Sequence, residues 1–251
     1  MPLSYRDFYY PLNVFMHVLT LEEGGVAALH YGLFEDGDEP IALAQRRSTD
    51  LLLSRLPQPP ATLLEVGIGL GDTLAELTRL GYDATGITPD DKQIVVARER
   101  HGDAIRIVRT GLETFTSAAP FDVVIFQESS QYIDSQTLWQ RMQQLAKDRV
   151  IVLDEFSIAD GGTLHSLARF LEEAARHGFR VVEELDLTSK AAPTIDYFSA
   201  RLPRYRSRLI DDLGLTNDQV DELITGGVNY RDHYDRGVYG YRLLVIERSA
   251  L

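Results

Sequence analysis

The residues best suited to bind a ligand form a glycine-rich segment in the first third of the chain. An apolar run, Leu63–Val66, leads directly into glycines that alternate with other residues, namely Gly67, Gly69 and Gly71. Glycine lets the backbone adopt positive φ angles and come close to a ligand. A helical pattern starts at Asp72, and the first turn of a helix offers unpaired N–H groups. The segment therefore predicts a strand, a ligand-binding turn and a helix in succession.

The spacing of these glycines differs from that of a dinucleotide-binding loop. Such a loop has the pattern G-x-G-x-x-G, and an acidic residue ends the second strand. Here Asp72 stands at the place of the third glycine, and Thr88 ends the second expected strand. Both departures count against a nicotinamide-dependent oxidoreductase.

Two motifs together resemble the class I S-adenosylmethionine (SAM)-dependent methyltransferases. The run E-V-G-I-G-L-G at residues 65–71 looks like their first motif. The run G-I-T-P-D-D-K-Q at residues 86–93, followed by Ala97, is similar to the second-strand pattern of one branch. That branch includes tocopherol methyltransferases, sarcosine and dimethylglycine methyltransferases, and cyclopropane fatty acid synthases. Pro89-Asp90 departs from the Leu-Ser that is usual there.

Two further segments extend the resemblance. The run F-D-V-V-I-F-Q-E-S-S-Q-Y-I at residues 121–133 resembles the fourth-strand motif, in which Glu128 and Ser129 match while Gln131 and Tyr132 replace a Glu-His pair. Leu29-His30-Tyr31-Gly32 resembles the H-Y-G segment that precedes the core in the same branch. A looser match at residues 111–113 falls where the family contacts adenine.

The resemblance implies that SAM is the cofactor and S-adenosyl-L-homocysteine (SAH) the product. It assigns the glycine loop to the methionine part of SAM, Glu65 to its ammonium group, and Thr88 and Gln93 to the ribose side. The full set of expected cofactor contacts is Tyr31, Glu65, Gly67, Gly69, Gly71, Thr88, Gln93, Leu112, Glu113 and Gln127.

The acceptor side is less defined by the sequence. The methyl group of SAM is already activated by its sulfonium, so transfer needs alignment and exclusion of water, and a base only if the acceptor must lose a proton. The expected catalytic candidates are His30, Tyr132 and His233, although packing or surface roles explain the same residues. The expected substrate contacts are Glu128, Arg204, Arg206 and Tyr230. Asp154-Glu155 lacks the further carboxylates of metal-dependent methyltransferases, so no metal is predicted.

The rest of the chain predicts elements that position these residues. From Ala61 onward, β-rich runs alternate with helical runs, which indicates a parallel sheet covered by helices. The expected strands are Thr62–Val66, Ala84–Thr88, Ile105–Val108, Asp122–Phe126, Val150–Leu153, Arg180–Glu184 and Tyr241–Glu247. The expected helices lie near Asp72–Leu80, Asp91–His101, Ser135–Lys147 and Leu164–His177.

Two segments fall outside this alternation. Residues 1–60 form a predicted helical cap segment that closes with Pro57-Gln58-Pro59-Pro60. Residues 188–238 form an insert before the last strand, with a helical run near Asn217–Ile224. Long excursions of this kind tend to be lids or binding elements, and a packing extension is the alternative. Residues 61–251 then form the SAM-binding domain, with this insert as its substrate cap.

Composition limits the classes of partner. The formal net charge is −13, which argues against a protein whose main task is to bind a phosphate backbone. The chain has no cysteine, which excludes disulfides and thiolate chemistry. No apolar stretch approaches the roughly 20 residues that span a bilayer, and no signal peptide is evident. A cytoplasmic protein with a small-molecule acceptor, neither inserted in a membrane nor bound to nucleic acid, is expected, and a homo-oligomer is left open.

These observations together predict an α/β, Rossmann-like SAM-dependent methyltransferase fold. It has a seven-stranded, mostly parallel sheet with helices on both faces and an antiparallel last strand. The expected function is methyl transfer from SAM to nitrogen, oxygen or carbon of a small metabolite. Two alternatives stay open: an enzyme of the same fold that catalyses a cyclisation or rearrangement, and a non-catalytic SAM-binding module.

Overall fold

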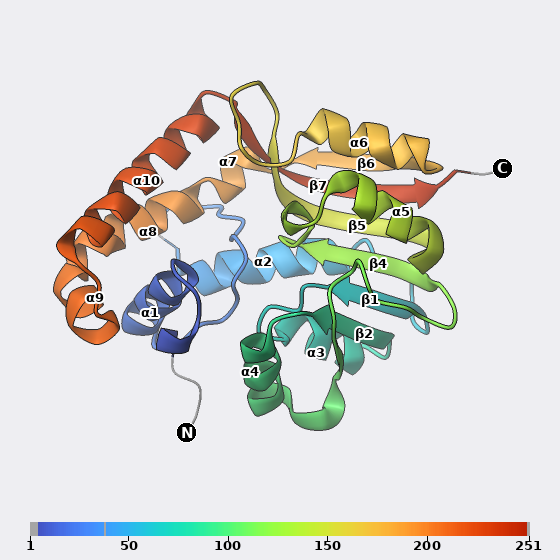
Figure 1. The fold of residues 1–251 in the computed structure, drawn as a ribbon, viewed down its shortest axis with the longest axis horizontal. Helices are drawn as coiled ribbons and strands as arrows, with labels where there is room; N and C mark the ends of the chain where they lie inside the picture. Colours follow the sequence, from blue (N-terminus) through green and yellow to red (C-terminus); the bar gives the residue numbers. More distant parts are fainter. Residues whose placement is uncertain (1–4, 38, 250–251) are drawn as a thin grey trace. The chain divides into compact units, whose positions relative to one another are not determined.

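Seven strands form a single sheet in the order β3-β2-β1-β4-β5-β7-β6 in the computed structural model, which describes residues 5–37 and 39–249 (Figure 1). Their bounds are β1 Thr62–Val66, β2 Asp83–Thr88, β3 Arg106–Arg109, β4 Phe121–Gln127, β5 Ala146–Ser157, β6 Phe179–Asp186 and β7 Tyr239–Arg248. Strands β1 to β5 pair in parallel, whereas β7 runs antiparallel to both β5 and β6. The predicted sheet, with its antiparallel last strand, is confirmed.

The central strands are apolar on both faces because both faces are covered. On one face Leu64, Val66 and their neighbours join a core with Trp139 and Phe170. The centroid of the Trp139 ring lies 5.2 Å from the ring centroids of both Phe170 and Phe179. Helices α5 (Ser135–Leu145) and α6 (Leu167–Arg176) supply this cover (Figure 1).

The opposite face of the sheet carries Glu65 and, in register beside it, Gly86. A Cβ atom at Gly86 would lie 2.4 Å from Ile68 Cγ2 and 2.7 Å from Leu74 Cδ2. Leu74 belongs to α3 (Asp72–Arg79), so this helix packs directly on the second strand. Helix α4 (Asp91–His101) and the short η2 (Gly102–Ala104) follow β2 and lead into β3.

Several element boundaries differ from the expected ones. The helix expected to reach Lys147 ends at Leu145, because Ala146 is already extended and begins β5. The helix expected from Leu164 starts after Ser166, whose side chain caps it by accepting a hydrogen bond from the Arg169 amide. The expected strand at Ile105–Val108 lies one residue further on.

The remaining helices lie mainly in the two outer segments of the chain. They are η1 (Tyr5–Asp7), α1 (Leu12–Glu23), α2 (Ile41–Leu53), α7 (Thr188–Ala191), α8 (Pro193–Arg204), α9 (Arg206–Leu213) and α10 (Asn217–Asp235). Apolar residues of α1, α8, α9 and α10 share a small core, made of Val14, Val18, Leu202, Leu209, Leu215 and Val220.

The chain divides into two compact units. Unit 1 comprises Met1–Ser48 with Ser189–Gly237, and unit 2 comprises Thr49–Thr188 with Val238–Leu251. The whole sheet belongs to unit 2. Within the described part of the chain, no helix has both the length and the apolar composition needed to cross a membrane.

Candidate functional site

The candidate site in unit 2 lies where the strand order reverses. The chain passes from β1 to β2 to β3 on one side, and β4 then pairs with the other side of β1. In open α/β sheets, ligands bind outside the carboxyl ends of the strands at such a switch point. The residues at this point are the glycine loop after β1 and Glu128-Ser129 after β4.

The glycine loop has the backbone that its sequence predicts. Gly67, Gly69 and Gly71 have φ angles of +78°, +52° and +83°, a region that costs other residues roughly 1–2 kcal/mol. A Cβ atom at Gly67 would lie 2.6 Å from Ser129 Cβ, and one at Gly71 would lie 2.8 Å from Ala97 Cβ. The glycines thus let the loop turn left-handed and pack against the end of β4 and against α4.

Glu65 is a buried carboxylate just before this loop. Its side chain is 2% exposed, and Oε2 has no hydrogen-bond partner among the described residues. Burial raises the pKa of Glu65 well above its usual range, and the nearby Asp72 raises this pKa further. Because an unpaired buried carboxylate is costly, the geometry fits a cationic or hydrogen-bond-donating ligand group at this position.

Thr88 and Gln93, the expected ribose-side residues, contact each other at the end of β2. Thr88 Oγ1 donates a hydrogen bond to Gln93 Oε1 at 2.8 Å, and the Asp90 amide donates to Thr88 Oγ1 at 3.2 Å. Asp90 in turn caps α4 by accepting from the amide of Lys92 at 2.8 Å. An aspartate is as good an N-cap as a serine, so Pro89-Asp90 preserves this helix start despite departing from Leu-Ser.

Three other residues of unit 2 are expected to contact the cofactor, namely Gln127, Leu112 and Glu113. Gln127 is buried and is bonded on both sides of its amide, accepting from Thr73 Oγ1 at 3.2 Å and donating to Thr49 Oγ1 at 3.5 Å. The side chain of Leu112 belongs to the hydrophobic core, whereas Glu113 is exposed. Because the side chain of Leu112 is packed in the core, only its backbone could contact a ligand.

Glu128 has an unusual backbone and a specific partner. Its φ is +53°, and no other non-glycine residue in the described ranges has a positive φ. Its Oε1 accepts a hydrogen bond of 2.6 Å from the hydroxyl of Tyr241 on β7. Tyr132, nearby in the chain on η3 (Ser130–Tyr132), is 74% exposed.

A second buried carboxylate, Asp154, holds the loop after β4. It accepts hydrogen bonds from the Ser130 amide at 2.9 Å, from Ser130 Oγ at 2.6 Å and from Gln131 Nε2 at 3.2 Å. Burial raises the pKa of Asp154 to about 6 although these donors oppose the shift. Sequence reasoning considered Asp154 only as a metal ligand and missed Tyr241, because nothing local marks a tyrosine 113 residues from its partner.

The expected site residues of the N-terminal segment lie in unit 1. His30 Nδ1 is 2.9 Å from the Tyr31 carbonyl oxygen, which can only accept, so Nδ1 carries the proton. Burial lowers the pKa of His30 to about 4. Gln45 holds the same segment by donating to the carbonyls of Ala28 and His30 at 3.1 and 2.8 Å.

The arginines expected to bind an acidic substrate are paired with carboxylates of their own unit. Arg204 Nη1 lies 3.1 Å from Glu22 Oε2, and Arg206 bonds Asp221. Their charges are therefore largely neutralised inside unit 1. On α10, Tyr230 packs near Tyr234 with ring centroids 6.0 Å apart, and His233 Nδ1 lies 2.7 Å from the Asn229 carbonyl.

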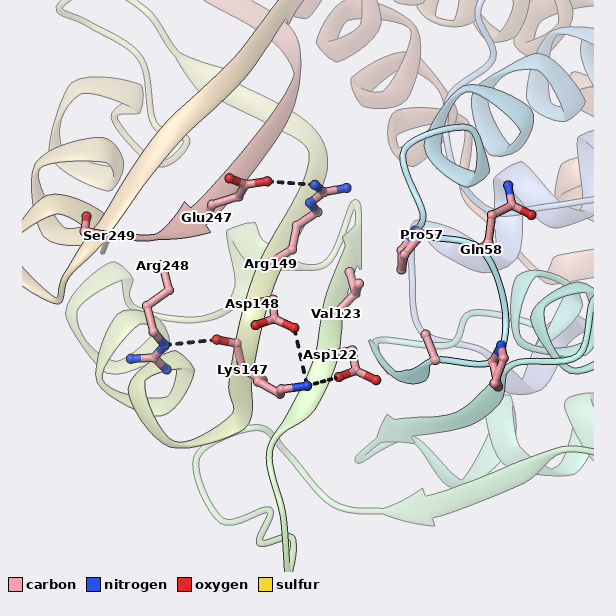
Figure 2. Close-up of a pocket in the computed structure, with 12 residues that line it drawn as sticks. Pro57, Gln58, Asp122, Val123, Lys147, Asp148, Arg149, Glu247, Arg248 and Ser249 are labelled. Atoms are coloured by element: carbon pink, nitrogen blue, oxygen red, sulfur yellow. Dashed lines mark hydrogen bonds and ion pairs between the residues drawn. The ribbon is translucent and has the colours of Figure 1, made fainter. Parts of the chain in front are cut away.

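A pocket of about 830 Å³ lies at the opposite edge of the sheet, at the amino ends of β4 and β5 (Figure 2). Figure 2 shows Lys147 between Asp122 and Asp148, and Arg149 paired with Glu247. The nitrogen–oxygen distances of these three ion pairs are 2.8, 3.6 and 2.7 Å. Lys147 and Arg149 thus have acidic partners, whereas Arg248, a third cation that lines the pocket, donates to the carbonyl oxygens of Lys147 and Gln143. Within the described residues no group of three or more His, Cys, Asp or Glu side chains is arranged to hold a metal ion.

A family model matches a segment that lies within unit 2. Residues 64–153 match the family model described as a methyltransferase domain. No curated protein sequence matches the chain.

Solved structures match over nearly the whole chain. A mycolic acid cyclopropane synthase, CmaA1, crystallised with SAH and CTAB, superposes with a TM-score of 0.81 at 18% identity and covers 98% of each chain. A putative sarcosine dimethylglycine methyltransferase from Galdieria sulphuraria gives 0.80 at 17% identity, covering 94% of this chain and 97% of the other. The cyclase SpnF gives 0.77 at 20% identity, covering 94% and 92%. The fold is that of the class I SAM-dependent methyltransferases, as the sequence predicts.

Proposed function

We propose that this chain, which carries a methyltransferase domain on the class I SAM-dependent methyltransferase fold, transfers a methyl group from SAM to nitrogen, oxygen or carbon of a small-molecule acceptor. The observation that carries the proposal is the unpartnered Oε2 of buried Glu65, next to a left-handed glycine loop at the switch point of the sheet. The ammonium group of SAM would supply a partner for this carboxylate.

The residues present fit SAM. Glu65 would bind the ammonium group of its methionine part, and the glycine loop would pass close to that part. Thr88 and Gln93 would lie on the ribose side, and Tyr31 of unit 1 stays a cofactor contact expected from the sequence resemblance. When bound, SAM supplies a methyl group that its sulfonium has already activated. The contribution of the protein is then alignment and exclusion of water.

A strong general base is not part of the proposal. His30 keeps a neutral imidazole above pH 4, since burial lowers its pKa to about 4, and such a group removes protons poorly at neutral pH. We assign to His30 a hydrogen-bonding role and keep Tyr132 and His233 as acceptor-side candidates. An acceptor that is nucleophilic in its neutral form needs no base. A small-molecule acceptor and a cytoplasmic location remain predictions from the sequence.

A second candidate is an enzyme that uses this fold for a reaction other than methyl transfer. The likeness to the cyclase SpnF supports keeping it. The two candidates differ in the fate of the methyl group. With SAM carrying a labelled methyl group, a methyltransferase moves the label into the acceptor, whereas a cyclase or rearrangement enzyme leaves it on SAM.

The assignment of Glu65 is tested by comparing two ligands. SAH has the amino-acid part that Glu65 would bind, and 5′-methylthioadenosine lacks it. We expect Glu65→Gln to weaken SAH binding about tenfold or more, the effect of roughly 1.4 kcal/mol, while binding of 5′-methylthioadenosine is unchanged in calorimetric titration. Glu172→Gln, at an exposed carboxylate paired with Arg176, is the matched control. Equal loss of both ligands, or no loss of SAH, would contradict the assignment.

A further inference from the structure

Two carboxylates flank the glycine loop of unit 2. Glu65 lies in β1, one residue before the strand ends, and Asp72 is the first residue of α3. The side chain of Glu65 is buried, whereas that of Asp72 is 41% exposed. Burial raises the pKa of Glu65, and the charge of Asp72 raises it further. The two carboxylates thus oppose each other's ionisation, as neighbouring like charges do.

Two basic side chains at the end of α4 compensate the charge of Asp72. Arg100 Nη1 donates a hydrogen bond to Asp72 Oδ2 at 2.9 Å. His101 Nε2 lies 3.2 Å from the other oxygen, Asp72 Oδ1. Burial raises the pKa of Asp72, and the contacts with these two residues oppose that shift. The last turn of α4 therefore helps to keep Asp72 ionised.

Glu65 has no comparable compensation within the described residues. Its Oε2 has no hydrogen-bond partner there. The residues beside it in the sheet are uncharged, namely Gly86 of β2 and Ile125 of β4. With His101 neutral, the two ionised carboxylates and the one guanidinium carry one net negative charge. A single ammonium group balances that charge and supplies the missing partner.

We infer that Asp72, Arg100 and His101 control the charge of Glu65, so that the site selects a cofactor whose amino group is cationic. This inference rests on the proposed function and deepens it, because it adds to the cofactor site a group of residues that act through Glu65. Arg100 is the positioning residue of this group. With its charge in place, Asp72 repels ionised Glu65 less, and Glu65 is ionised in more of the molecules at a given pH.

The pH dependence of SAH binding tests this inference. Binding that requires ionised Glu65 weakens as the pH falls and Glu65 takes up a proton, because only the ionised fraction is competent. Calorimetric titration between about pH 5 and about pH 8.5 measures the midpoint of this fall. The midpoint is the readout, rather than the affinity, because Asp72 also attracts the ammonium group directly. 5′-Methylthioadenosine, which lacks the amino-acid part, should show no such fall.

Two variants should move the midpoint in opposite directions. We expect Arg100→Gln to move it to higher pH, because uncompensated Asp72 makes the ionisation of Glu65 harder. We expect Asp72→Asn to move it to lower pH, because the opposing charge is gone. At the wild-type midpoint, Arg100→Gln should thus keep less than half of its own high-pH affinity, and Asp72→Asn more than half. Arg106→Gln is the matched control, since Arg106 forms a similar 2.8 Å pair with Asp83 at the amino end of β2, and its midpoint should equal that of wild type.

A double variant shows whether Arg100 acts through Glu65. In a Glu65→Gln background, position 65 cannot ionise, so adding Arg100→Gln should not change the pH profile of SAH binding. An equal change in both backgrounds would overturn the inference, because Arg100 would then act on the loop or on the ligand directly. An equal change for SAH and 5′-methylthioadenosine would overturn it for the same reason.

The remaining outcomes separate the inference from the function on which it rests. Failure of wild-type protein to bind SAH at any pH would overturn the proposed function and this inference with it. Normal SAH binding with one common midpoint in wild type, Arg100→Gln and Asp72→Asn would overturn the inference alone. Melting temperatures at the same pH values show which variants stay folded. If Arg100→Gln unfolds, the direction of the shift in Asp72→Asn decides.

Discussion

At the scale of single residues, the sequence predicts those parts of the site whose conformation depends on neighbouring residues in the chain. The three loop glycines and Glu65 are recognisable by type and spacing, and the structure gives the glycines the left-handed angles that their residue type permits. The contact of Tyr241 with Glu128 is not recognisable in this way, because it depends on the pairing of β7 with β5. Contacts between distant strands decide that part of the site.

A side chain at Gly67 would have less room than one at Gly71. We expect Gly67→Ala to lose SAH binding and about 2–3 kcal/mol of unfolding free energy, because the new Cβ would lie 2.6 Å from Ser129 Cβ at a φ of +78°. Gly214→Ala is the control, since Gly214 has a left-handed φ of +70° but a Cβ atom there would meet nothing within 4 Å. It should lose only about 1–2 kcal/mol and bind SAH normally. Equal effects of the two changes in titration would contradict the packing argument.

Asp154 predicts a specific dependence of stability on pH. Its pKa is about 6 in the folded protein against an ordinary 3.8, so the folded state binds this proton more tightly than the unfolded state. The contribution of Asp154 to stability is therefore full below about pH 4, and it falls as pH rises to about 6.

Urea unfolding of wild type and Asp154→Asn at several pH values measures this contribution. The advantage of wild type over the variant should shrink by up to about 3 kcal/mol between pH 4 and pH 6. Asp122→Asn should behave oppositely, because hydrogen bonding to Lys147 and Thr62 lowers the pKa of Asp122 to about 2. Its stabilising effect is present above about pH 4 and lost as pH falls toward 2. A difference for Asp154→Asn that is constant with pH would contradict the raised pKa.

At the scale of elements, the sequence indicates where the central strands lie. It underestimates the length of β5, which pairs with a strand far away in the sequence. The expected strand Val150–Leu153 is the apolar centre of β5, whose polar flanks are extended because β7 pairs with Arg149 through Ser157. In the insert, the run expected near Asn217–Ile224 continues to Asp235 through two glycines. Glycine disfavours a helix interior, so packing rather than propensity extends α10.

The two glycines inside α10 make a matched pair. A Cβ atom at Gly227 would lie 2.8 Å from Ser199 Oγ of α8, whereas one at Gly226 would meet nothing within 4 Å. We expect Gly226→Ala to raise the unfolding free energy by about 1 kcal/mol, the difference in helix propensity. Gly227→Ala should gain less or lose stability, since Ser199 must move. Thermal unfolding compares them, and an equal gain would show that α8 and α10 do not pack closely at this point.

At the scale of the whole molecule, the alternation of strand and helix in the sequence indicates a parallel sheet, and β1 to β5 pair in parallel as expected. The Rossmann-like sheet with an antiparallel last strand is confirmed. Of the four helices between β6 and β7, the sequence indicates only the start of α10, and Pro203, a residue that disfavours helix interiors, lies inside α8. The structure instead pairs those arginines with carboxylates inside unit 1.

The central claim is that this fold binds SAM, and calorimetric titration of the purified chain with SAH tests it most directly. NAD⁺ serves as the control, because a glycine-rich loop alone does not separate the two cofactors. The account predicts one SAH bound per chain with micromolar affinity, and no binding of NAD⁺. A folded, ligand-free sample that binds NAD⁺, or that does not bind SAH, would contradict it.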